Sequence, residues 1–162
     1  MNNKNKILTK ASLQKKIAVL KRQGKTIAFT NGCFDILHMG HVAYLEKAKH
    51  NNRILIVGLN SDVSVKKIKG PKRPIVPQKG RAYVLAALAC VDFVTIFNED
   101  TPYQLIKALK PHILVKGADW KGKEVSGADV VKAAGGKVEL IKFIPNSSST
   151  NIIQTIIKRC EA

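Results

Sequence analysis

Residues 26–41 read TIAFTNGCFDILHMGH and hold the clearest structural signal in the chain. The stretch begins with a short apolar run, residues 26–30, which predicts a buried strand. The Asn31–Gly32 pair then lets the backbone turn sharply as it leaves the sheet. A helical pattern follows over residues 42–49. A strand, a glycine-containing turn and a helix in this order predict the first unit of an α/β fold.

Outside this stretch, short apolar runs alternate with helical patterns. The further strands are expected at residues 53–59, 93–97, 113–115 and 138–144, and the further helices at residues 12–23, 81–90, 103–109, 128–134 and 150–159. Strands that are apolar throughout and separated by helices predict a parallel sheet covered on both faces. The expected fold is α/β, a Rossmann-like parallel sheet of about five strands, with the active-site loops at the carboxyl ends of the strands.

One segment differs in character from these alternating elements. Residues 66–81 hold three prolines, two glycines and seven basic residues, and the longer stretch 63–91 contains no acidic residue. Proline and glycine predict an ordered but mobile surface loop over residues 66–81. Because seven like charges repel one another, we expect this loop to bind an anion.

Two basic residues of this segment are candidates to bind that anion. Lys69 is predicted to close over it as a mobile lysine, and Arg81 to stand as a fixed cation at the start of the next helix. Lys72, Arg73 and Lys79 are predicted instead to lie on a solvated face.

The charge balance of the whole chain also points to anionic partners. The 162 residues contain 28 Lys and Arg against 11 Asp and Glu, a net charge of +17. This charge predicts attraction to polyanions, but it does not separate nucleic acid from nucleotide, phosphorylated sugar or membrane surface. Aromatic residues make up only 6% of the chain and no reading helix is recognisable, which disfavours a nucleic-acid-binding module.

Chain length and hydropathy favour one globular domain. A length of 162 residues and an apolar content of 45% are ordinary for a compact domain. No apolar run approaches the roughly 20 residues of a membrane span, and a charge interrupts any signal-peptide core. The three cysteines follow no disulfide or metal pattern. We expect a cytoplasmic protein with one domain over residues 1–162, in which a basic helix within 1–24 packs on a core over 25–162; a membrane-surface or import helix is the alternative.

The two histidines that end the opening stretch are the first candidates for chemistry. His38 and His41 are three residues apart where a helix begins, so both imidazoles can face one side. Gly40 between them removes a side chain where another group must approach the backbone. A helix N-terminus presents unpaired N–H donors, and the imidazoles add donors for charge that grows on phosphate oxygens. This context favours phosphate chemistry over a metal site or a solvated pair.

Residues 32–41 (GCFDILHMGH) resemble the His-x-Gly-His signature of the cytidylyltransferase-like nucleotidyltransferase superfamily. Within it, the chain resembles the branch that adenylylates D-glycero-β-D-manno-heptose 1-phosphate. The other stretches that carry this resemblance are 58–62 (GLNSD), 69–71 (KGP), 73–75 (RPI), 81–82 (RA), 100–102 (DTP), 114–120 (LVKGADW), 127–129 (GAD) and 148–153 (SSTNII). Met39 stands where the family commonly has proline. Residues 143–146 lack the arginine of related cytidylyltransferases, which weakens a cytidylyltransferase assignment.

The resemblance implies a nucleotide site between the first strand and the final helix. His38 and His41 are implied to stabilise the pentavalent α-phosphate, and Lys69 is the third catalytic candidate. The residues implied to bind the nucleotide are Thr30, Asn31, Gly32, Phe34, His38, Gly40, His41, Arg81, Ser148, Ser149 and Thr150. For the last three, a simple helix N-cap is the alternative and is compatible with phosphate binding.

A second group of residues is assigned to the acceptor substrate: Asp35, Asn60, Asp62, Lys116, Asp119 and Trp120. Asp35 is equally well explained as a brace for its own loop, and Asp62 as the cap of the helix that follows it. Lys116 and Asp119 are expected to emerge at the catalytic edge, where a buried lysine needs a ligand or a carboxylate partner. Trp120 either lines the substrate pocket or packs in the core.

The implied reaction transfers AMP from ATP to D-glycero-β-D-manno-heptose 1-phosphate and releases pyrophosphate, for lipopolysaccharide core or surface-glycan precursors. Mg²⁺ is implied with ATP, bound mainly by the ATP phosphates. Because 162 residues leave no room for the sugar kinase fused to many relatives, a separate upstream kinase is expected, and relatives imply a homodimer. A glycerol-3-phosphate cytidylyltransferase is the alternative enzyme, and a basic nucleic-acid-binding module is the alternative of another class.

Overall fold

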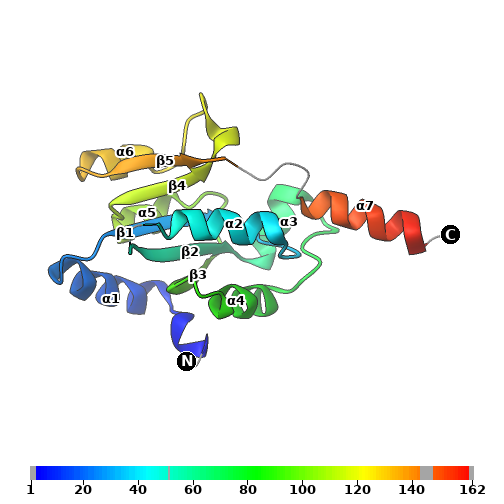
Figure 1. Ribbon diagram of the computed structural model, residues 1–162, viewed down its shortest axis with the longest axis horizontal. Helices are drawn as coiled ribbons and strands as arrows, with labels where there is room; N and C mark the ends of the chain where they lie inside the picture. Colours follow the sequence, from blue (N-terminus) through cyan, green and yellow to red (C-terminus); the bar gives the residue numbers. More distant parts are fainter. Residues whose placement is uncertain (1–2, 51, 143–147, 161–162) are drawn as a thin grey trace.

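The computed structural model describes residues 3–50, 52–142 and 148–160, and within them the chain forms one parallel sheet flanked by helices (Figure 1). The strands are β1 (Ile27–Gly32), β2 (Ile54–Asn60), β3 (Phe93–Phe97), β4 (Ile113–Gly117) and β5 (Lys137–Ile141). Their order in the sheet is β3-β2-β1-β4-β5, and every neighbouring pair is parallel. The predicted Rossmann-like α/β architecture is therefore confirmed.

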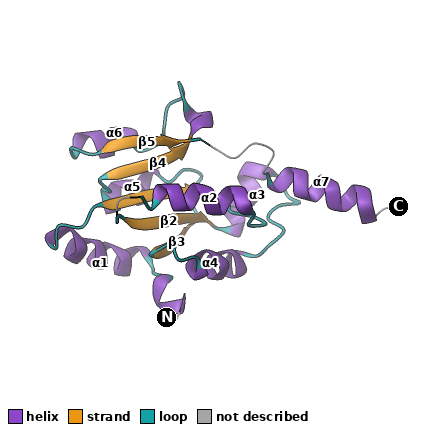
Figure 2. Cartoon of the chain, in the orientation of Figure 1, coloured by secondary structure: helices purple, strands orange, loops and turns teal. Residues whose placement is uncertain are grey.

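Helices cover both faces of this sheet (Figure 2). One core cluster joins the sheet to α2 (Met39–Ala48) and α4 (Gln78–Ala87), and the other joins it to α1 (Lys10–Arg22), α5 (Tyr103–Leu109) and α6 (Ala128–Ala133). A strand between two such layers buries both of its faces, which explains why the strands read as continuous apolar runs. In α1, Leu13 and Ile17 are buried against the sheet, so the prediction that the basic N-terminal helix packs on the core is confirmed.

A glycine in β2 makes room for the central strand. A Cβ atom at Gly58 would lie 2.7 Å from the ring of Phe29, which comes from β1 and has no exposed surface. The ring is packed in the apolar cluster on the α1 side of the sheet. A larger residue at position 58 would therefore have to displace the Phe29 ring within the core.

The strand order creates a crevice beside β1. The chain leaves β1 towards β2 on one side, whereas β4 lies on the other side and is followed by β5 at the far edge. Ligands of open parallel sheets bind where the direction of winding reverses, outside the carboxyl ends of the strands. In this chain that place lies between the carboxyl ends of β1 and β4.

The basic segment is shorter and more ordered than its composition suggests. The prediction of a mobile loop over residues 66–81 is wrong at both ends, because α3 (Asp62–Lys69) and α4 occupy its flanks. The remaining residues, 70–77, are tied down by hydrogen bonds to the carboxylate of Asp35. Lysine-rich sequence is compatible with a helix when the ends are capped, and Ser61 caps α3 by accepting a hydrogen bond from the backbone N–H of Ser64.

The remaining corrections concern element ends. The strand expected over residues 138–144 ends at Ile141, and residues 143–147, which include the stretch that lacks the arginine, lie outside the described residues. Two short 3-10 helices, η1 (Asn3–Lys6) and η2 (Ala118–Trp120), were not predicted. The last helix, α7 (Ser149–Cys160), begins one residue early and extends away from the sheet in Figure 1. Within the described residues, no helix is long and apolar enough to cross a bilayer.

Candidate active site

The two imidazoles meet at the start of α2. This helix begins at Met39, so His38 is its N-cap residue and His41 lies in its first turn. Their rings stack with centroids 3.8 Å apart and an interplanar angle of 29°. The Nδ1 atoms of both rings are buried and have no hydrogen-bond partner among the described residues. Nε2 of each ring is therefore the nitrogen left to meet a ligand.

Burial keeps this pair neutral. Desolvation lowers the pKa of His41 to about 4, helped by the neighbouring His38 and opposed by Asp35. Burial also lowers the pKa of His38. Both rings are therefore uncharged near pH 7. An unpartnered buried nitrogen is better left as a lone pair than as an N–H group, which favours the tautomer that carries its proton on Nε2.

The loop that leads to the histidines is unusually shaped. Phe34 and Ile36 both have positive φ angles, 45° and 53°, a region that residues other than glycine rarely adopt. The ring of Phe34 is buried and lies 5.3 Å from that of His41, centroid to centroid. A Cβ atom at Gly32 would stand 3.1 Å from the Phe34 ring, a tight contact that glycine avoids. Strained backbone of this kind is typical of functional sites.

Asp35 holds this loop to residues 70–77. Its carboxylate is 2% exposed and accepts hydrogen bonds from Arg73 Nε at 2.6 Å and from the backbone N–H groups of Ile75 and Val76 at 2.9 Å. Burial by itself would raise the pKa of Asp35, but these donors outweigh it and lower the pKa below its usual value. Of the two alternatives for Asp35, the contacts fit the loop brace. The prediction of a solvated Arg73 is wrong, because the Asp35 carboxylate binds it.

Arg81 is the second residue that holds the histidine loop to neighbouring segments by hydrogen bonds. It is 2% exposed and donates four hydrogen bonds: to the carbonyl oxygens of Val76, Cys33 and Asn60 and to the carboxylate of Asp62. It thus joins the histidine loop to the ends of β2 and the start of α3. Arg81 is confirmed as a fixed cation of α4, but its donors are directed inward. A direct contact between Arg81 and phosphate stays a prediction.

Asn60 and Asp62 are also engaged within the protein. Asn60 is 3% exposed and donates to Ser64 Oγ at 2.9 Å. Asp62 does not cap its own helix, since Ser61 does; its carboxylate instead accepts from the N–H of Gln78 at the start of α4. The return bond, from the Asp62 N–H to the Gln78 side chain, completes a reciprocal pair at 2.8 Å. Substrate roles for Asn60 and Asp62 stay predictions.

The facing side of the crevice contains Lys116. This β4 residue is 5% exposed, and its Nζ donates to Asn31 Oδ1, at the end of β1, over 2.5 Å. The ammonium also lies 5.0 Å from the centre of the Trp120 ring. Burial lowers the pKa of Lys116 to about 8, and the charge of Asp119 opposes that shift. Lys116 ends β4 and Asp119 follows it, as expected, and Trp120 lies beside Lys116. Substrate roles for these three residues stay predictions.

Thr30 precedes Asn31 in β1 and is fully buried. Its hydroxyl and the hydroxyl of Tyr44 in α2 form a hydrogen bond of 2.8 Å. Tyr44 was not predicted as a site residue, and only its position one turn after His41 could have indicated it. The contact fixes α2 against the end of β1. Gly40 is buried in the first turn of the same helix.

The start of α7 reaches the same loop. The hydroxyl of Ser149 donates to the backbone carbonyl oxygen of Asp35. Ser148 Oγ accepts from the N–H of Asn151 at 3.1 Å, which confirms the predicted N-cap. Thr150 is exposed. A phosphate role for the serines and Thr150 stays a prediction, but their helix end does lie beside the histidine loop.

Positive charge gathers around the loop. Burial raises the pKa of the Cys33 thiol, and three cations oppose that rise: Lys69, Arg81 and Arg73. Lys69 is exposed at the last residue of α3, beside the loop and outside its internal hydrogen bonds. Of these three cations, Lys69 is therefore the one that is exposed to a ligand from solvent. Its catalytic role stays a prediction.

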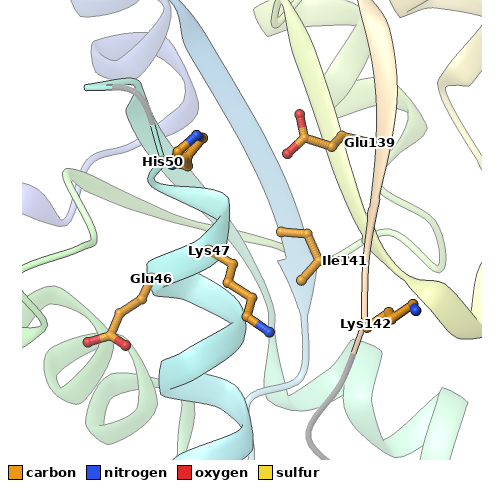
Figure 3. A pocket seen from close by; sticks show the side chains of 6 residues that line it. All are labelled: Glu46, Lys47, His50, Glu139, Ile141 and Lys142. Atoms are coloured by element: carbon orange, nitrogen blue, oxygen red, sulfur yellow. The ribbon is translucent and has the colours of Figure 1, made fainter.

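One hollow of the structure lies away from these residues. A cavity of about 550 Å³ opens between the second half of α2 and β5 (Figure 3). It is lined by Glu46, Lys47, His50, Glu139, Ile141 and Lys142. Glu139 is already paired with both terminal nitrogens of Arg53 at 2.9 Å. The ion pair with Arg53 therefore explains the position of the Glu139 carboxylate in this cavity. We place the catalytic site at the two histidines instead.

The fold and this site define a nucleotidyltransferase, an enzyme that works on nucleotide phosphates. The chain belongs to the cytidylyltransferase-like family, whose model matches residues 29–159. That match extends from β1 to α7 and so includes both histidines, Lys116 and the serines of the last helix.

Among curated proteins, the chain is similar to bifunctional HldE proteins. The protein of Syntrophotalea carbinolica is 50% identical over 157 residues, which cover 97% of this chain and 32% of that protein. The protein of a Nitratiruptor species is 60% identical over 135 residues, 83% of this chain and 28% of that protein. The chain thus spans about a third of the length of these relatives.

Solved structures show the same fold. A lipopolysaccharide core biosynthesis protein from Thermoplasma volcanium matches with a TM-score of 0.59 and 27% identity, over 75% of this chain and 98% of that one. A pantoate-beta-alanine ligase from Francisella tularensis matches with a TM-score of 0.57 and 16% identity, over 96% of this chain and 79% of that one, which supports the fold alone.

Proposed function

We propose that this chain transfers AMP from ATP to D-glycero-β-D-manno-heptose 1-phosphate, giving ADP-heptose and pyrophosphate. The observation that supports this most strongly is the stacked, neutral pair His38 and His41 at the N-terminus of α2, beside the crevice of the sheet. Similarity to HldE proteins at 50% to 60% identity supports the heptose branch of the family.

The histidine pair suits charge stabilisation rather than proton transfer. A pKa of about 4 leaves His41 unable to accept a proton stably near pH 7. As neutral rings, both imidazoles offer Nε2–H donors, and the first N–H groups of α2 add to them. These donors would bind the α-phosphate oxygens, whose negative charge grows in the transition state.

The chemistry follows an in-line displacement. An oxygen of the sugar phosphate attacks the α-phosphorus of ATP and forms the new P–O bond. The bond from that phosphorus to the bridging oxygen of the β-phosphate breaks, and pyrophosphate leaves with the electron pair. Because a phosphate monoester is already ionised near neutral pH, no general base is needed, and catalysis consists of alignment and charge stabilisation. Lys69 would neutralise the departing pyrophosphate.

The proposed metal ion arrives with the nucleotide. In the described part of the chain, no group of three or more His, Cys, Asp or Glu side chains could hold a metal. The carboxylates of Asp35 and Asp62 already accept hydrogen bonds from protein donors. The protein therefore fits a divalent cation that is carried by the triphosphate, where it would supply further positive charge to the phosphate oxygens. Mg²⁺ is the proposed ion.

The partners follow from the substrates. ATP and the sugar phosphate are the proposed ligands, and a sugar kinase, as a second chain or a fused domain, would supply the sugar phosphate. The name of the relatives, bifunctional, is consistent with a second activity on the same longer chain. Assembly as a homodimer stays a prediction.

A grid of substrates tests the function. Pyrophosphate release is measured for ATP, CTP, GTP and UTP, each with heptose 1-phosphate, other sugar 1-phosphates and glycerol 3-phosphate. The proposal expects ATP with the heptose phosphate to exceed every other pair. A maximum for CTP with glycerol 3-phosphate would identify the alternative enzyme, and RNA binding without pyrophosphate release would favour the nucleic-acid-binding alternative.

A further inference from the structure

Lys116 is a buried cation that forms no ion pair among the described residues, and the charge of Asp119 acts on it without direct contact. Its side chain comes from the end of β4, where only 5% of the residue is exposed. The hydrogen-bond acceptor, Asn31, is a neutral amide, and the Trp120 ring offers a cation–π contact at 5.0 Å. Burying an ammonium without an opposite charge is costly, so such a lysine is rare unless a ligand completes its environment.

A cavity lies next to Trp120, the residue whose ring Lys116 contacts. It has a volume of about 350 Å³ and is lined by residues of η2, of the turn after it, of α6 and of β5. Trp120 is part of its wall, and so is Leu140, the residue of β5 that pairs with Lys116 in the sheet. Paired residues of parallel strands project from the same face. The cavity thus adjoins the Lys116 end of the crevice.

The lining of this cavity suits a sugar. Trp120 offers an aromatic face for the apolar side of a pyranose ring. Val125 and Val138 contribute further apolar surface, while Lys123 and Glu124 place charged groups that can exchange hydrogen bonds with hydroxyls. A volume of about 350 Å³ is adequate for one monosaccharide.

We propose that Lys116 receives the phosphate group of the sugar phosphate, in place of Asn31, and that the cavity beside Trp120 holds its sugar ring. This inference rests on the proposed function and names the acceptor half of that site. A phosphate oxygen gives Lys116 the anionic partner that the amide does not, so the hydrogen bond gains the attraction between opposite charges in a largely desolvated place. A pKa of about 8 keeps most Lys116 side chains protonated at pH 7.

The exchange would also couple the two substrates. Asn31 lies at the end of β1 and opens the loop assigned to the nucleotide, whereas Lys116 belongs to the acceptor side. When an acceptor phosphate replaces Asn31 as the hydrogen-bond acceptor of Lys116, the Asn31 side chain is free to turn towards the nucleotide. Each substrate is then expected to increase the affinity for the other, because linkage is reciprocal.

The first experiment uses Lys116→Met, which keeps the length of the side chain and removes its charge. Calorimetry without nucleotide measures the binding of heptose 1-phosphate and of the unphosphorylated heptose. A second titration measures a non-hydrolysable ATP analogue. The matched control is Lys137→Met, at the exposed opposite end of β5. We expect Lys116→Met to weaken heptose 1-phosphate binding about tenfold or more, with the free sugar and the ATP analogue changed less than about twofold.

The second experiment fills the cavity without touching Lys116. Ala128, at the first position of α6, lines the cavity, and Ala128→Leu would occupy part of its volume. This variant should weaken heptose 1-phosphate binding about tenfold and leave binding of inorganic phosphate unchanged. Thermal unfolding of each variant confirms that it is folded.

Two results would overturn the inference. One is wild-type affinity of Lys116→Met for heptose 1-phosphate, which would leave Lys116 as a purely structural residue. The other is wild-type affinity of Ala128→Leu, which would place the sugar elsewhere. Because these titrations contain no reacting nucleotide, they are independent of turnover: an absence of pyrophosphate release in the substrate grid would defeat the proposed function alone.

Discussion

The Asp35 carboxylate and the Arg73 guanidinium join the histidine loop to residues 70–77 through a contact of 2.6 Å that is shielded from solvent on the Asp35 side. Asp35→Asn should remove the charge that holds this contact and two backbone N–H groups. Breaking one partner of a buried pair typically costs about 3 kcal/mol, so urea unfolding should show a loss of about that size. Turnover should fall with it, because the loop carries both imidazoles.

The control for Asp35→Asn is Asp100→Asn. Asp100 pairs with Lys67 at 3.1 Å, and both side chains are more than half exposed. Exposed pairs contribute about 0 to 1 kcal/mol, so this variant should unfold close to the wild-type midpoint. Equal stability of the two variants would show that Asp35 does not brace the loop.

His41→Ala tests the stacked imidazoles. Loss of one preorganised donor typically lowers kcat by about a hundredfold, and we expect that much or more while the fold is kept. His50→Ala is the control, since His50 is exposed at the far end of α2. Steady-state pyrophosphate release gives kcat, and circular dichroism checks the fold. Unchanged turnover of His41→Ala would exclude His41 from the mechanism.

The buried imidazole also makes a prediction about stability and pH. Since the pKa of His41 falls from 6.5 to about 4 on folding, the unfolded chain binds more protons between these values. The free energy of unfolding should therefore fall as pH drops from 6.5 to 4, by at most about 3 kcal/mol from this residue, and His41 adds nothing further below pH 4. Chemical unfolding at several pH values measures this slope.

His41→Phe is the comparison for that slope. Phenylalanine keeps a ring beside Phe34 and cannot titrate. The fall in stability between pH 6.5 and 4 should be smaller in the variant, whereas the contributions of His38 and His112, whose pKa values are also lowered, remain in both proteins. The loss from Asp35, whose pKa is lowered, comes at still lower pH. Identical slopes would mean that His41 is not desolvated.

The parts of the fold that sequence predicted well are those set by local rules. The strand at 93–97 and the helix at 103–109 match the structure at both ends, because apolar pattern and Pro102 define them without reference to distant residues. The stacking of His38 on His41 follows from their spacing of three at a helix start. Such features depend on a few neighbouring residues, and so they can be read from the chain.

What sequence could not predict depends on strand order and on distant pairs. Arg73 is one of seven basic residues in its segment, and its partner Asp35 lies 38 positions earlier. The sequence contained one weak indication of this contact. Residues 63–91 hold no acidic residue, so any carboxylate that pairs with a cation of this stretch must come from elsewhere in the chain. The contact of Lys116 with Asn31 requires β4 to lie beside β1, which no local pattern encodes.

Lys69 and Lys72 provide the sharpest test of the basic segment, because they are three residues apart and both exposed. Lys69 ends α3, close enough to Cys33 for its charge to act on the thiol, whereas Lys72 has no such effect. Lys69→Met should lower kcat at least tenfold, and Lys72→Met should change it less than about twofold, although both remove one positive charge. Pyrophosphate release at saturating substrates measures both. Equal losses would mean that the segment acts through its summed charge, and raising the salt concentration would then reduce turnover of the wild type as much as either substitution does.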